Sequence, residues 1–569
     1  MAETLLSPGV LTRENDQSIV TQGPIVAGAA IIGPAVRGPV NVPTLVTSYS
    51  DYRSRFGTSF QSSSIQYEYL TSISAYNYFQ QGGASLLVTR VVTGSFIPAS
   101  ASIVSVTSAV NSFELESITE GSAANAGTLI GKSGSLASGS DDNVRWEVTA
   151  IDTGSGTFNL LIRRGNDNQQ QKVVLEQYRG LSLDPTSQNY ITARIGDQKQ
   201  TLNGDYIQIT GSFQNLSRYV RVKSVAMPTP DYFDNSGTAK SQFTNYLPVV
   251  GSGSYGGSFS GGTGDNIPTD HAGLYYDKIS TQTQGLVAAD YSDMLTLLAN
   301  QDDYRYNLML LPGLTDASHS SPLTTAINNA QSRGDHLVVI DPVNYGDTLT
   351  NAKTEAGGRD TSYAAMYWPW VRTIDPDSGK NVWVPASTVM GGVFAFNDNA
   401  SEPWFAPAGI NRGGLGTVIQ AERKLSATNR DDLYQSNVNP IATFPGTGVV
   451  VYGQKTLQKK SSALDRVNVR RLLIELKNYI GQVAQNLVFE QNTAATRNNF
   501  LAQVNPYLES VQSRQGLYAF RVIMDDSNNT PDVIDRNQLV GQIYLQPTRT
   551  AEFIYLDFNL QPTGATFPS

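Results

Sequence analysis

Apolar and polar positions alternate in two clearly different ways along the middle of the chain. Residues 94–247 hold short runs of alternating apolar and polar residues, separated by clusters of Ser, Gly, Asn and Asp. Such runs are typical of antiparallel β-hairpins. Residues 290–342 instead alternate continuous apolar runs with helical patterns. Apolar strands that alternate with helices indicate a parallel sheet that is covered on both faces.

The N-terminal part predicts a β-α-α-β unit. Its first apolar run is rich in small residues, which favours a strand that packs closely against another backbone. The expected elements are a strand at residues 24–33, a strand and a short helix at 42–57 with its N-cap at Ser50 or Asp51, a helix at 64–83 closed by Gly82, and a strand at 84–92.

The C-terminal part predicts two helices followed by strands. From Leu464 onward, apolar residues recur at steps of three, one and four, which is the period of one buried helical face. A second helical pattern follows Thr493 and is interrupted at Asn505 and Pro506. Since proline removes a helical hydrogen bond, we expect a kink or a restart there. Three strands are expected at residues 516–524, 538–547 and 551–560.

The last predicted strand, residues 551–560, has one strictly apolar side and one mixed side. An apolar strand with an open edge is a liability unless another strand pairs with it. That partner strand can belong to another chain.

Six separated segments of the C-terminal part resemble, in the same order, the contractile tail sheath proteins of myovirus-type phages and of related contractile injection particles. One such segment would be a weak signal, whereas six in order are a strong one. The resemblance is detailed from Trp404 onward, thinner at the N-terminus, and absent from residues 95–247. The segments are APAGINRG, LYQSNVNP, VVYGQKT, DRVNVRRLL, NNTPDVIDRN and IYLQPTRTAEFIYLDF.

The resemblance implies an α/β multidomain protein. Its sheath core would be discontinuous, built from N- and C-terminal parts, with an antiparallel β-rich domain inserted on the outside. The expected division is 1–22 for an N-terminal arm, 23–93 for the N-terminal part of the core, 94–247 for the β-rich insertion, 248–360 for an α/β domain, 361–550 for the C-terminal sheath core and 551–569 for a C-terminal strand or arm.

The resemblance also implies a structural, non-enzymatic function. Such a subunit polymerises as stacked hexameric rings around a tail tube, and contraction drives the tube through the host envelope. The implied partners are further copies of the chain, the tail tube protein, and baseplate and tail terminator proteins. The implied location is the virion, after assembly in the host cytoplasm.

In this family, terminal arms are expected to complete β-sheets in neighbouring subunits, and the helix from Leu464 is the candidate to face the tube. The expected arm residues are Ser7, Pro8, Gly9, Val10, Phe553, Tyr555, Leu556 and Phe558. The candidate tube-facing residues are Lys459, Arg466, Arg470 and Arg471; the alternative for these basic residues is an ordinary solvated helix face.

Composition narrows the function classes. The chain has 40 Lys and Arg against 49 Asp and Glu, with a net charge of −9, which argues against direct nucleic-acid binding. It has no cysteine, which removes disulfides and thiolate ligands and suits a reducing compartment. Neither a signal peptide nor an apolar run long enough for membrane insertion is expected.

No arrangement of candidate chemical groups predicts an active site, a cofactor site or a metal site. His336 and Asp341 fall at opposite ends of one predicted strand, so they cannot share a proton. His271 and His319 lack the spacing of metal ligands. The Ser, Asp and His residues of 313–321 share one predicted loop, whereas catalytic triads are usually assembled from distant segments.

Two other classes of function remain open from the sequence. One is a hydrolase or carbohydrate-binding enzyme whose α/β segment carries the chemistry and whose β-rich domain recognises the substrate. The other is a monomeric adhesin. Neither has a supporting motif, so a polymerising sheath subunit is the leading hypothesis.

Overall fold

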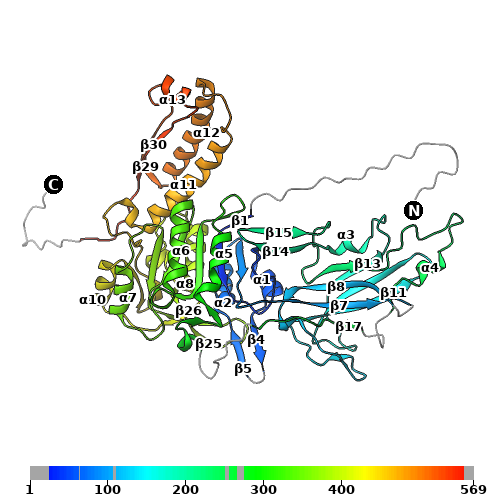
Figure 1. The fold of residues 1–569 in the computed structure, drawn as a ribbon. Coiled ribbons are helices and arrows are strands. Elements are labelled where there is room, and N and C mark those ends of the chain that lie inside the picture. The colour runs from blue at the N-terminus through cyan, green and yellow to red at the C-terminus, as the bar shows by residue number, and fades with distance from the viewer. Residues whose placement is uncertain (1–24, 63–64, 107–109, 250–255, 266–274, 556–569) are drawn as a thin grey trace, which may run out of the picture.

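The computed structural model describes residues 25–555 apart from 63–64, 107–109, 250–255 and 266–274. Figure 1 shows a central body of helices around a sheet, an elongated β-rich part beside it, and a projecting pair of helices that carries a small hairpin. The central body holds two apolar cores, and the other two parts hold one each. The predicted α/β multidomain class is therefore confirmed.

An eight-stranded sheet forms the centre of the body, in the order β28-β27-β23-β22-β21-β2-β6-β3. Neighbours from β27 to β6 run parallel, whereas β28 and β3 form antiparallel pairs at the two edges. N-terminal strands thus share a sheet with strands that begin only at Leu308. The strands are β2 (Ala29–Gly33), β3 (Thr44–Val46), β6 (Leu86–Arg90), β21 (Leu308–Thr315), β22 (Leu337–Asp341), β23 (Ala364–Trp368), β27 (Val438–Phe444) and β28 (Gly448–Val451).

Alternate residues of the central strands enter two different apolar cores. Leu308 and Leu310 of β21 belong to one core, and Met309 and Leu311 belong to the other. Because side chains of a strand point alternately to its two faces, the sheet is covered on both sides, as the apolar runs predict. The covering helices are α2 (Leu70–Gln80) and α8 (Ala386–Ala400) on one face, and α5 (Ser292–Leu297), α6 (Asp316–Arg333), α7 (Leu349–Gly357) and α10 (Ala427–Gln435) on the other.

Two details of the predicted N-terminal unit are wrong. Helix α1 (Tyr49–Phe56) is capped by Ser48, whose hydroxyl accepts a hydrogen bond from the Asp51 backbone, rather than by Ser50 or Asp51. The helix expected at 64–83 begins at Leu70, because the residues before it form an antiparallel hairpin, β4 (Ser59–Ser62) with β5 (Ile65–Glu68). The alternating sequence Ile-Gln-Tyr-Glu suits a strand better than a helix.

Smaller sheets complete the body. Strands β24 (Val371–Ile374) and β25 (Asn381–Val384) form a hairpin around the Asp-Pro-Asp-Ser-Gly turn. Trp368 and Trp370 are buried, whereas Trp383 is only partly buried. The other elements are β1 (Ile25–Ala27), which pairs with β20 (Tyr304–Tyr306), β26 (Val418–Ala421), the pair β18 (Gln282–Thr283) and β19 (Leu286–Val287), and α9 (Gly409–Arg412).

The β-rich part is a stack of antiparallel sheets, as the alternating pattern predicts. The two larger sheets meet around one core, in which the rings of Phe113 and Phe158 stack 5.6 Å apart. One sheet holds β11 (Val144–Asp152), β12 (Thr157–Arg164), β13 (Val174–Ser182) and β17 (Gly257–Ser258), and the other holds β7 (Pro98–Val104), β8 (Asn111–Glu120) and β16 (Val220–Val225); shorter elements are β9 (Leu129–Ile130), β10 (Ser135–Leu136), α3 (Ile191–Ile195) and α4 (Ser241–Thr244).

A hairpin and a buried arginine join the β-rich part to the body. Hairpin β14 (Lys199–Asn203) and β15 (Tyr206–Thr210) packs Leu202 and Ile207 against a core of the body. Arg90 is buried at the end of β6, and its Nη1 donates to the carbonyl oxygens of Gly38 (2.7 Å) and Glu120 (2.9 Å). These contacts give the junction both apolar packing and charge-assisted hydrogen bonds.

The projecting part consists of α11 (Val467–Gln485), α12 (Ala494–Ser513), β29 (Leu517–Ile523), the short α13 (Pro531–Asp535) and β30 (Gln542–Pro547). The expected kink or restart at Asn505 is wrong: α12 continues through Pro506. Phe500, Val504 and Leu508 are buried on both sides of the proline. This continuous packed face outweighs the hydrogen bond that Pro506 cannot donate.

The strand expected at residues 551–560 is not formed in the part that the structure describes. Residues 551–555 are extended without strand pairing, and Leu556 and Phe558 lie outside the described residues. Phe553, Ile554 and Tyr555 are 69%, 76% and 89% exposed. Their apolar surface therefore has no partner within the described part of the same chain, which is why the pattern alone does not produce a strand.

Candidate assembly interface

The hairpin of β29 and β30 has two open edges. Within the described residues, these strands pair with each other from Leu517 with Pro547 to Ile523 with Gln542, and with no further strand. Phe520 and Leu545 pack toward the helices, whereas the rings of Tyr518 and Tyr544 are exposed. An isolated two-stranded sheet is marginally stable, and unpaired edges are templates for another strand.

The segment that follows β30 is tied to the body at Glu552. Arg466 donates from Nε to Oε1 of Glu552 (2.8 Å) and from Nη2 to Oε2 (3.0 Å). The hydroxyl of Tyr434 donates to Oε2 (2.7 Å), and Nε2 of Gln454 donates to Oε1 (3.0 Å). Burial alone would raise the pKa of Glu552, but the hydrogen bonds from Arg466 and Tyr434 outweigh it and lower this pKa. We call these three donors the Glu552 socket.

The sequence pattern alone does not reveal the Glu552 socket. Its members are far apart in the chain, so no local period or spacing connects them. A signal was nevertheless present, because Tyr434, Gln454, Arg466 and Glu552 each fall in a different one of the six segments that carry the resemblance. In the folded chain, four of those segments meet at one carboxylate.

Two of the candidate tube-facing residues are wrong for this conformation, because the fold buries them. Arg470 is 4% exposed and its guanidinium lies over the ring of Tyr363, 4.0 Å from the centroid. Arg471 is 3% exposed and binds both carboxylate oxygens of Asp398 at 2.6 Å. A buried guanidinium that is already paired cannot meet a partner surface.

The remaining basic candidates are accessible to different degrees. Lys459 is exposed, and its Nζ donates to the carbonyl oxygen of Gly357 (2.8 Å). Arg466 is half-buried because it holds Glu552. The N-terminal arm candidates Ser7, Pro8, Gly9 and Val10 lie outside the described residues.

The groups considered for catalysis have structural partners. Asp341 accepts hydrogen bonds from the Ser387 backbone (2.9 Å) and hydroxyl (2.5 Å) at the start of α8. Burial raises the pKa of Asp341 to about 7. His336 pairs through Nδ1 with Asp335 (2.8 Å), which also binds Arg333. These contacts hold the ends of a helix and a strand in place. They do not bring Asp341 and His336 together as an acid and a base at one site.

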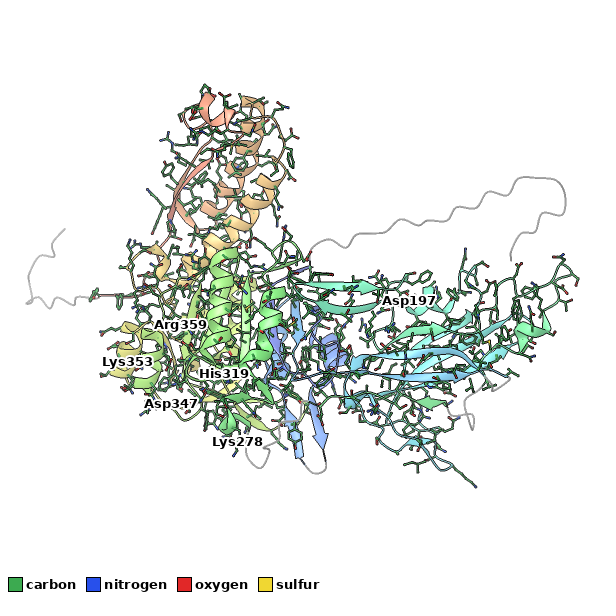
Figure 2. The ribbon with its side chains drawn as sticks, viewed as in Figure 1. Asp197, Lys278, His319, Asp347, Lys353 and Arg359 are labelled. Atoms are coloured by element: carbon green, nitrogen blue, oxygen red, sulfur yellow. The ribbon has the colours of Figure 1, made fainter. Side chains whose placement is uncertain are left out.

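The stretch 313–321 is not the loop that the sequence predicts. It spans the end of β21 and the first turns of α6. Figure 2 shows His319 from this stretch, and Arg359 from the segment after α7, in the central body. His319 accepts a hydrogen bond at Nδ1 from the Thr315 backbone (3.2 Å), and burial lowers its pKa to about 4. Asp316 forms an ion pair with Arg359 (2.5 Å). His271 lies outside the described residues.

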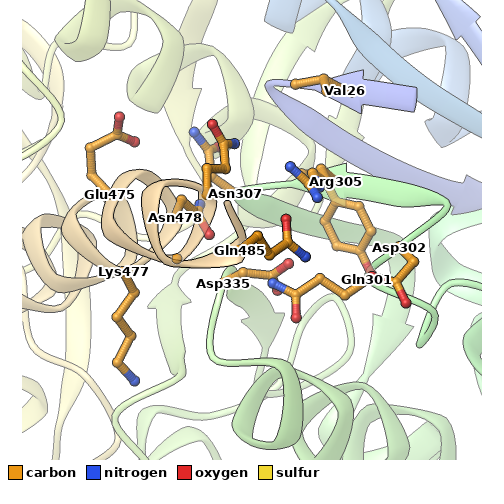
Figure 3. Close-up of a pocket in the computed structure, with 14 residues that line it drawn as sticks. Val26, Gln301, Asp302, Arg305, Asn307, Asp335, Glu475, Lys477, Asn478 and Gln485 are labelled. Atoms are coloured by element: carbon orange, nitrogen blue, oxygen red, sulfur yellow. The ribbon is translucent and has the colours of Figure 1, made fainter. Parts of the chain in front are cut away.

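A polar cleft of about 410 Å³ opens between α11 and the β1–β20 pair (Figure 3). Asp335 lines it but is already paired, and Nζ of Lys477 lies 3.3 Å from the hydroxyl of Tyr363. Among the described residues, no group of His, Cys, Asp and Glu could hold a metal ion, and no helix is long and apolar enough to cross a membrane.

Two family models match the chain in succession. Residues 286–457 match the phage tail sheath protein central domain, and residues 459–561 match the phage tail sheath C-terminal domain. These two regions are thus similar to domains of phage tail sheath proteins, and the resemblance stated from the sequence is confirmed.

Individual relatives give the same result. The tail sheath protein of Vibrio phage KVP40 is 39% identical over 228 residues, which is 40% of this chain and 33% of the relative. The tail sheath protein of Enterobacteria phage T4 is 39% identical over 228 residues, 39% of this chain and 35% of the relative. The chain thus aligns with about a third of the length of these relatives. A crystal structure of a sheath tail protein from Listeria innocua matches the fold, with a TM-score of 0.53 at 12% identity over 92% of this chain and 95% of that chain.

Proposed function

We propose that the protein is a structural subunit of a contractile phage tail sheath, without enzymatic activity. It polymerises as stacked hexameric rings around a tail tube, and contraction of the stack drives the tube through the host envelope. Support comes from the two matching sheath domains and from the identity of the relatives. The subunit assembles in the host cytoplasm and resides in the virion.

The observation that carries this proposal is that the same chain has both a hairpin with open edges and a segment with a strand pattern that is not paired. Within the described residues, the outer edges of β29 and β30 lack a neighbouring strand, and Phe553, Ile554 and Tyr555, which begin the apolar strand pattern, pair with no strand. A strand from one subunit that adds to the hairpin of another satisfies both. The N-terminal segment around Ser7, Pro8, Gly9 and Val10 is proposed as a second added strand.

We propose that the central body is a discontinuous sheath core into which the β-rich part is inserted, with the boundaries expected from the sequence except that the insertion extends past residue 247 to include β17. Support comes from the shared sheet, in which β2 lies beside β21 and the N-terminal strands β6 and β3 follow β2 in order to the edge. The β-rich part then lies on the outside of the sheath. Lys459 faces the tail tube together with the exposed side of α11, and the ends of the stack meet baseplate and tail terminator proteins.

Electron microscopy of the purified full chain tests this proposal. A sheath subunit forms hollow tubes or stacked rings, and removal of residues 553–569 abolishes them while leaving a folded, dispersed subunit. A matched control keeps those residues but replaces exposed Glu490 with Gln. Small particles from the intact chain under every assembly condition, or unchanged tubes from the truncated chain, would contradict the proposal.

A further inference from the structure

The Glu552 socket collects donors from three separate elements around one carboxylate. Tyr434 lies near the end of α10, Gln454 follows β28, and Arg466 is the N-cap residue of α11. Gln454 also donates to the hydroxyl of Thr550 (2.6 Å), so the chain is held at two positions, 550 and 552. Phe553, Ile554 and Tyr555, the last described residues, have no such contact within the described part, and their side chains are exposed.

The contact is stronger than an ordinary surface ion pair. The Arg466 and Glu552 side chains are 24% and 18% exposed, and the guanidinium binds both carboxylate oxygens. Planar two-bond pairs of this kind fix orientation as well as distance. Nζ of Lys455 lies 4.6 Å from the centroid of the Tyr434 ring, and this cation–π contact helps to hold the ring in place.

The socket is also continuous with the rigid part of the body. Lys455 and Arg466 form an antiparallel bridge, and the backbone N–H of Val467 donates to the carbonyl oxygen of Gln454 (2.8 Å). The first turn of α11 is thus fastened to the chain that leaves the edge strand β28. A pull on Glu552 acts directly on this junction and reaches the central sheet without passing through the β29–β30 hairpin.

We propose that the Glu552 socket is the fixed root of the C-terminal arm. This inference rests on the proposed function. The chain up to Glu552 stays on its own subunit in the assembled sheath, and the bridge to a neighbour begins at Phe553. Tyr434, Gln454 and Arg466 are positioning residues: they set the point and direction from which the arm leaves and carry its load to the start of α11.

Hydrogen exchange on the full chain tests the root without requiring assembly. Glu552→Gln removes the charge but keeps the shape, and exchange at residues 548–553 should become at least tenfold faster, while the strands of the central sheet keep their protection. Glu490→Gln is the matched control and should change neither. Unchanged exchange at 548–553 in Glu552→Gln would overturn the proposal even if the protein forms normal sheaths.

Cross-linking decides whether the contact stays within one subunit. Because the chain has no cysteine, Gln454→Cys with Thr550→Cys supplies a unique pair that keeps the Arg466–Glu552 contact. A short bismaleimide should join the two within one chain, both in dispersed subunits and in assembled tubes. Cross-links between chains in the tubes would overturn the proposal, since they would show that neighbouring subunits exchange this segment.

Assembly gives a readout that distinguishes this inference from the proposed function. With a detached root, Glu552→Gln should still polymerise, because residues 553–569 are intact, but it should give tubes of irregular length and diameter. Regular tubes from Glu552→Gln would overturn the role of the socket and leave the sheath function standing. Absence of tubes from the unaltered chain would instead count against the sheath function. The hydrogen-exchange measurement would still test whether the Glu552 socket holds the start of the arm.

Discussion

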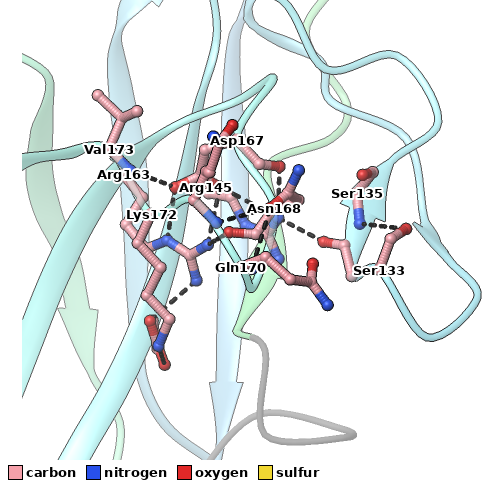
Figure 4. A network of polar contacts seen from close by, with 12 residues as sticks. Ser133, Ser135, Arg145, Arg163, Asp167, Asn168, Gln170, Lys172 and Val173 are labelled. Atoms are coloured by element: carbon pink, nitrogen blue, oxygen red, sulfur yellow. Dashed lines mark hydrogen bonds and ion pairs between the residues drawn. The ribbon is translucent and has the colours of Figure 1, made fainter.

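Arg163 and Asp167 form a doubly hydrogen-bonded ion pair in the interior of the β-rich part (Figure 4). Nε of Arg163 lies 2.7 Å from Oδ2 of Asp167, and Nη2 lies 2.8 Å from Oδ1, with both side chains fully buried. Glu147 binds the same guanidinium at 2.9 Å, and Arg145 lies 3.3 Å from Asp167. The network ties strands β11 and β12 to the turn that follows β12.

Asp167→Ala should destabilise the β-rich part by about 3–5 kcal/mol, because it removes the buried carboxylate that the guanidinium groups of Arg145 and Arg163 share. The loss should show as faster hydrogen exchange in β11 and β12, with the central sheet unaffected. Asp532→Ala is the control, since its pair with Arg536 is exposed at the surface and should contribute less than about 1 kcal/mol. Equal effects of the two substitutions would contradict the importance of burial.

The stability of the central body should decrease as the pH falls from 6.5 toward 4, in part through His319. Burial lowers the pKa of this imidazole from 6.5 to about 4. The unfolded chain therefore binds a proton at a pH where the folded chain does not, which favours unfolding. The contribution present above pH 6.5 is about 1–3 kcal/mol and is lost as the pH falls through 4.

His319→Asn isolates this effect, since an Asn oxygen can accept the hydrogen bond of the Thr315 backbone without titrating. Denaturant unfolding at pH 7.5 and at pH 5 should show a smaller loss of stability for the variant than for the unaltered chain. Asp341 acts in the opposite direction, because its pKa is raised to about 7 and its contribution is lost as the pH rises. An identical pH dependence for both chains would exclude His319 as a cause.

The parallel strands of the central sheet could be predicted from sequence because each strand has a recognisable local pattern. Strands β21 and β22 are continuous apolar runs, and a run of that kind between helices has few alternatives to a buried parallel strand. Which distant strands lie side by side, such as β2 beside β21, is a tertiary relationship that no local period contains.

The assembly surfaces were predicted less well, for the same reason. The exposed residues Phe553 and Tyr555 were expected from their strand pattern, but that pattern does not reveal that Glu552 is held by Tyr434 and Arg466. The charge of Arg471 suggested a surface position, whereas its side chain is buried and pairs with the half-buried Asp398. Charged residues on a helix indicate a solvated face only when no opposite charge from another element covers them.

The loop between α11 and α12 exposes an aromatic side chain in a strained conformation. Phe489 has φ +70° and is fully exposed. Phe489→Gly should leave the stability unchanged or raise it by up to about 1 kcal/mol, because glycine adopts this backbone conformation without a Cβ clash. Phe500→Ala, which empties a buried position on α12, should cost about 3–5 kcal/mol by comparison. Chemical denaturation of both variants measures the difference, and a large loss for Phe489→Gly would show that its ring is packed.

Pro506→Ala should stabilise the projecting helical part, since α12 is continuous at this position and proline is exposed there. Alanine restores the backbone hydrogen bond to the carbonyl oxygen of Ala502, and it relieves the clash of the ring with the preceding turn. The expected gain is about 1–3 kcal/mol, less than or equal to the propensity difference between the two residues. Thermal unfolding should show a higher midpoint for the variant, together with slower hydrogen exchange at residues 502–510.

Another exposed position on α12, Asn499→Ala, controls for a general gain in helix propensity and should give a smaller change. A lower midpoint for Pro506→Ala would contradict this prediction. It would mean that α12, although continuous, needs the proline to bend around its buried face.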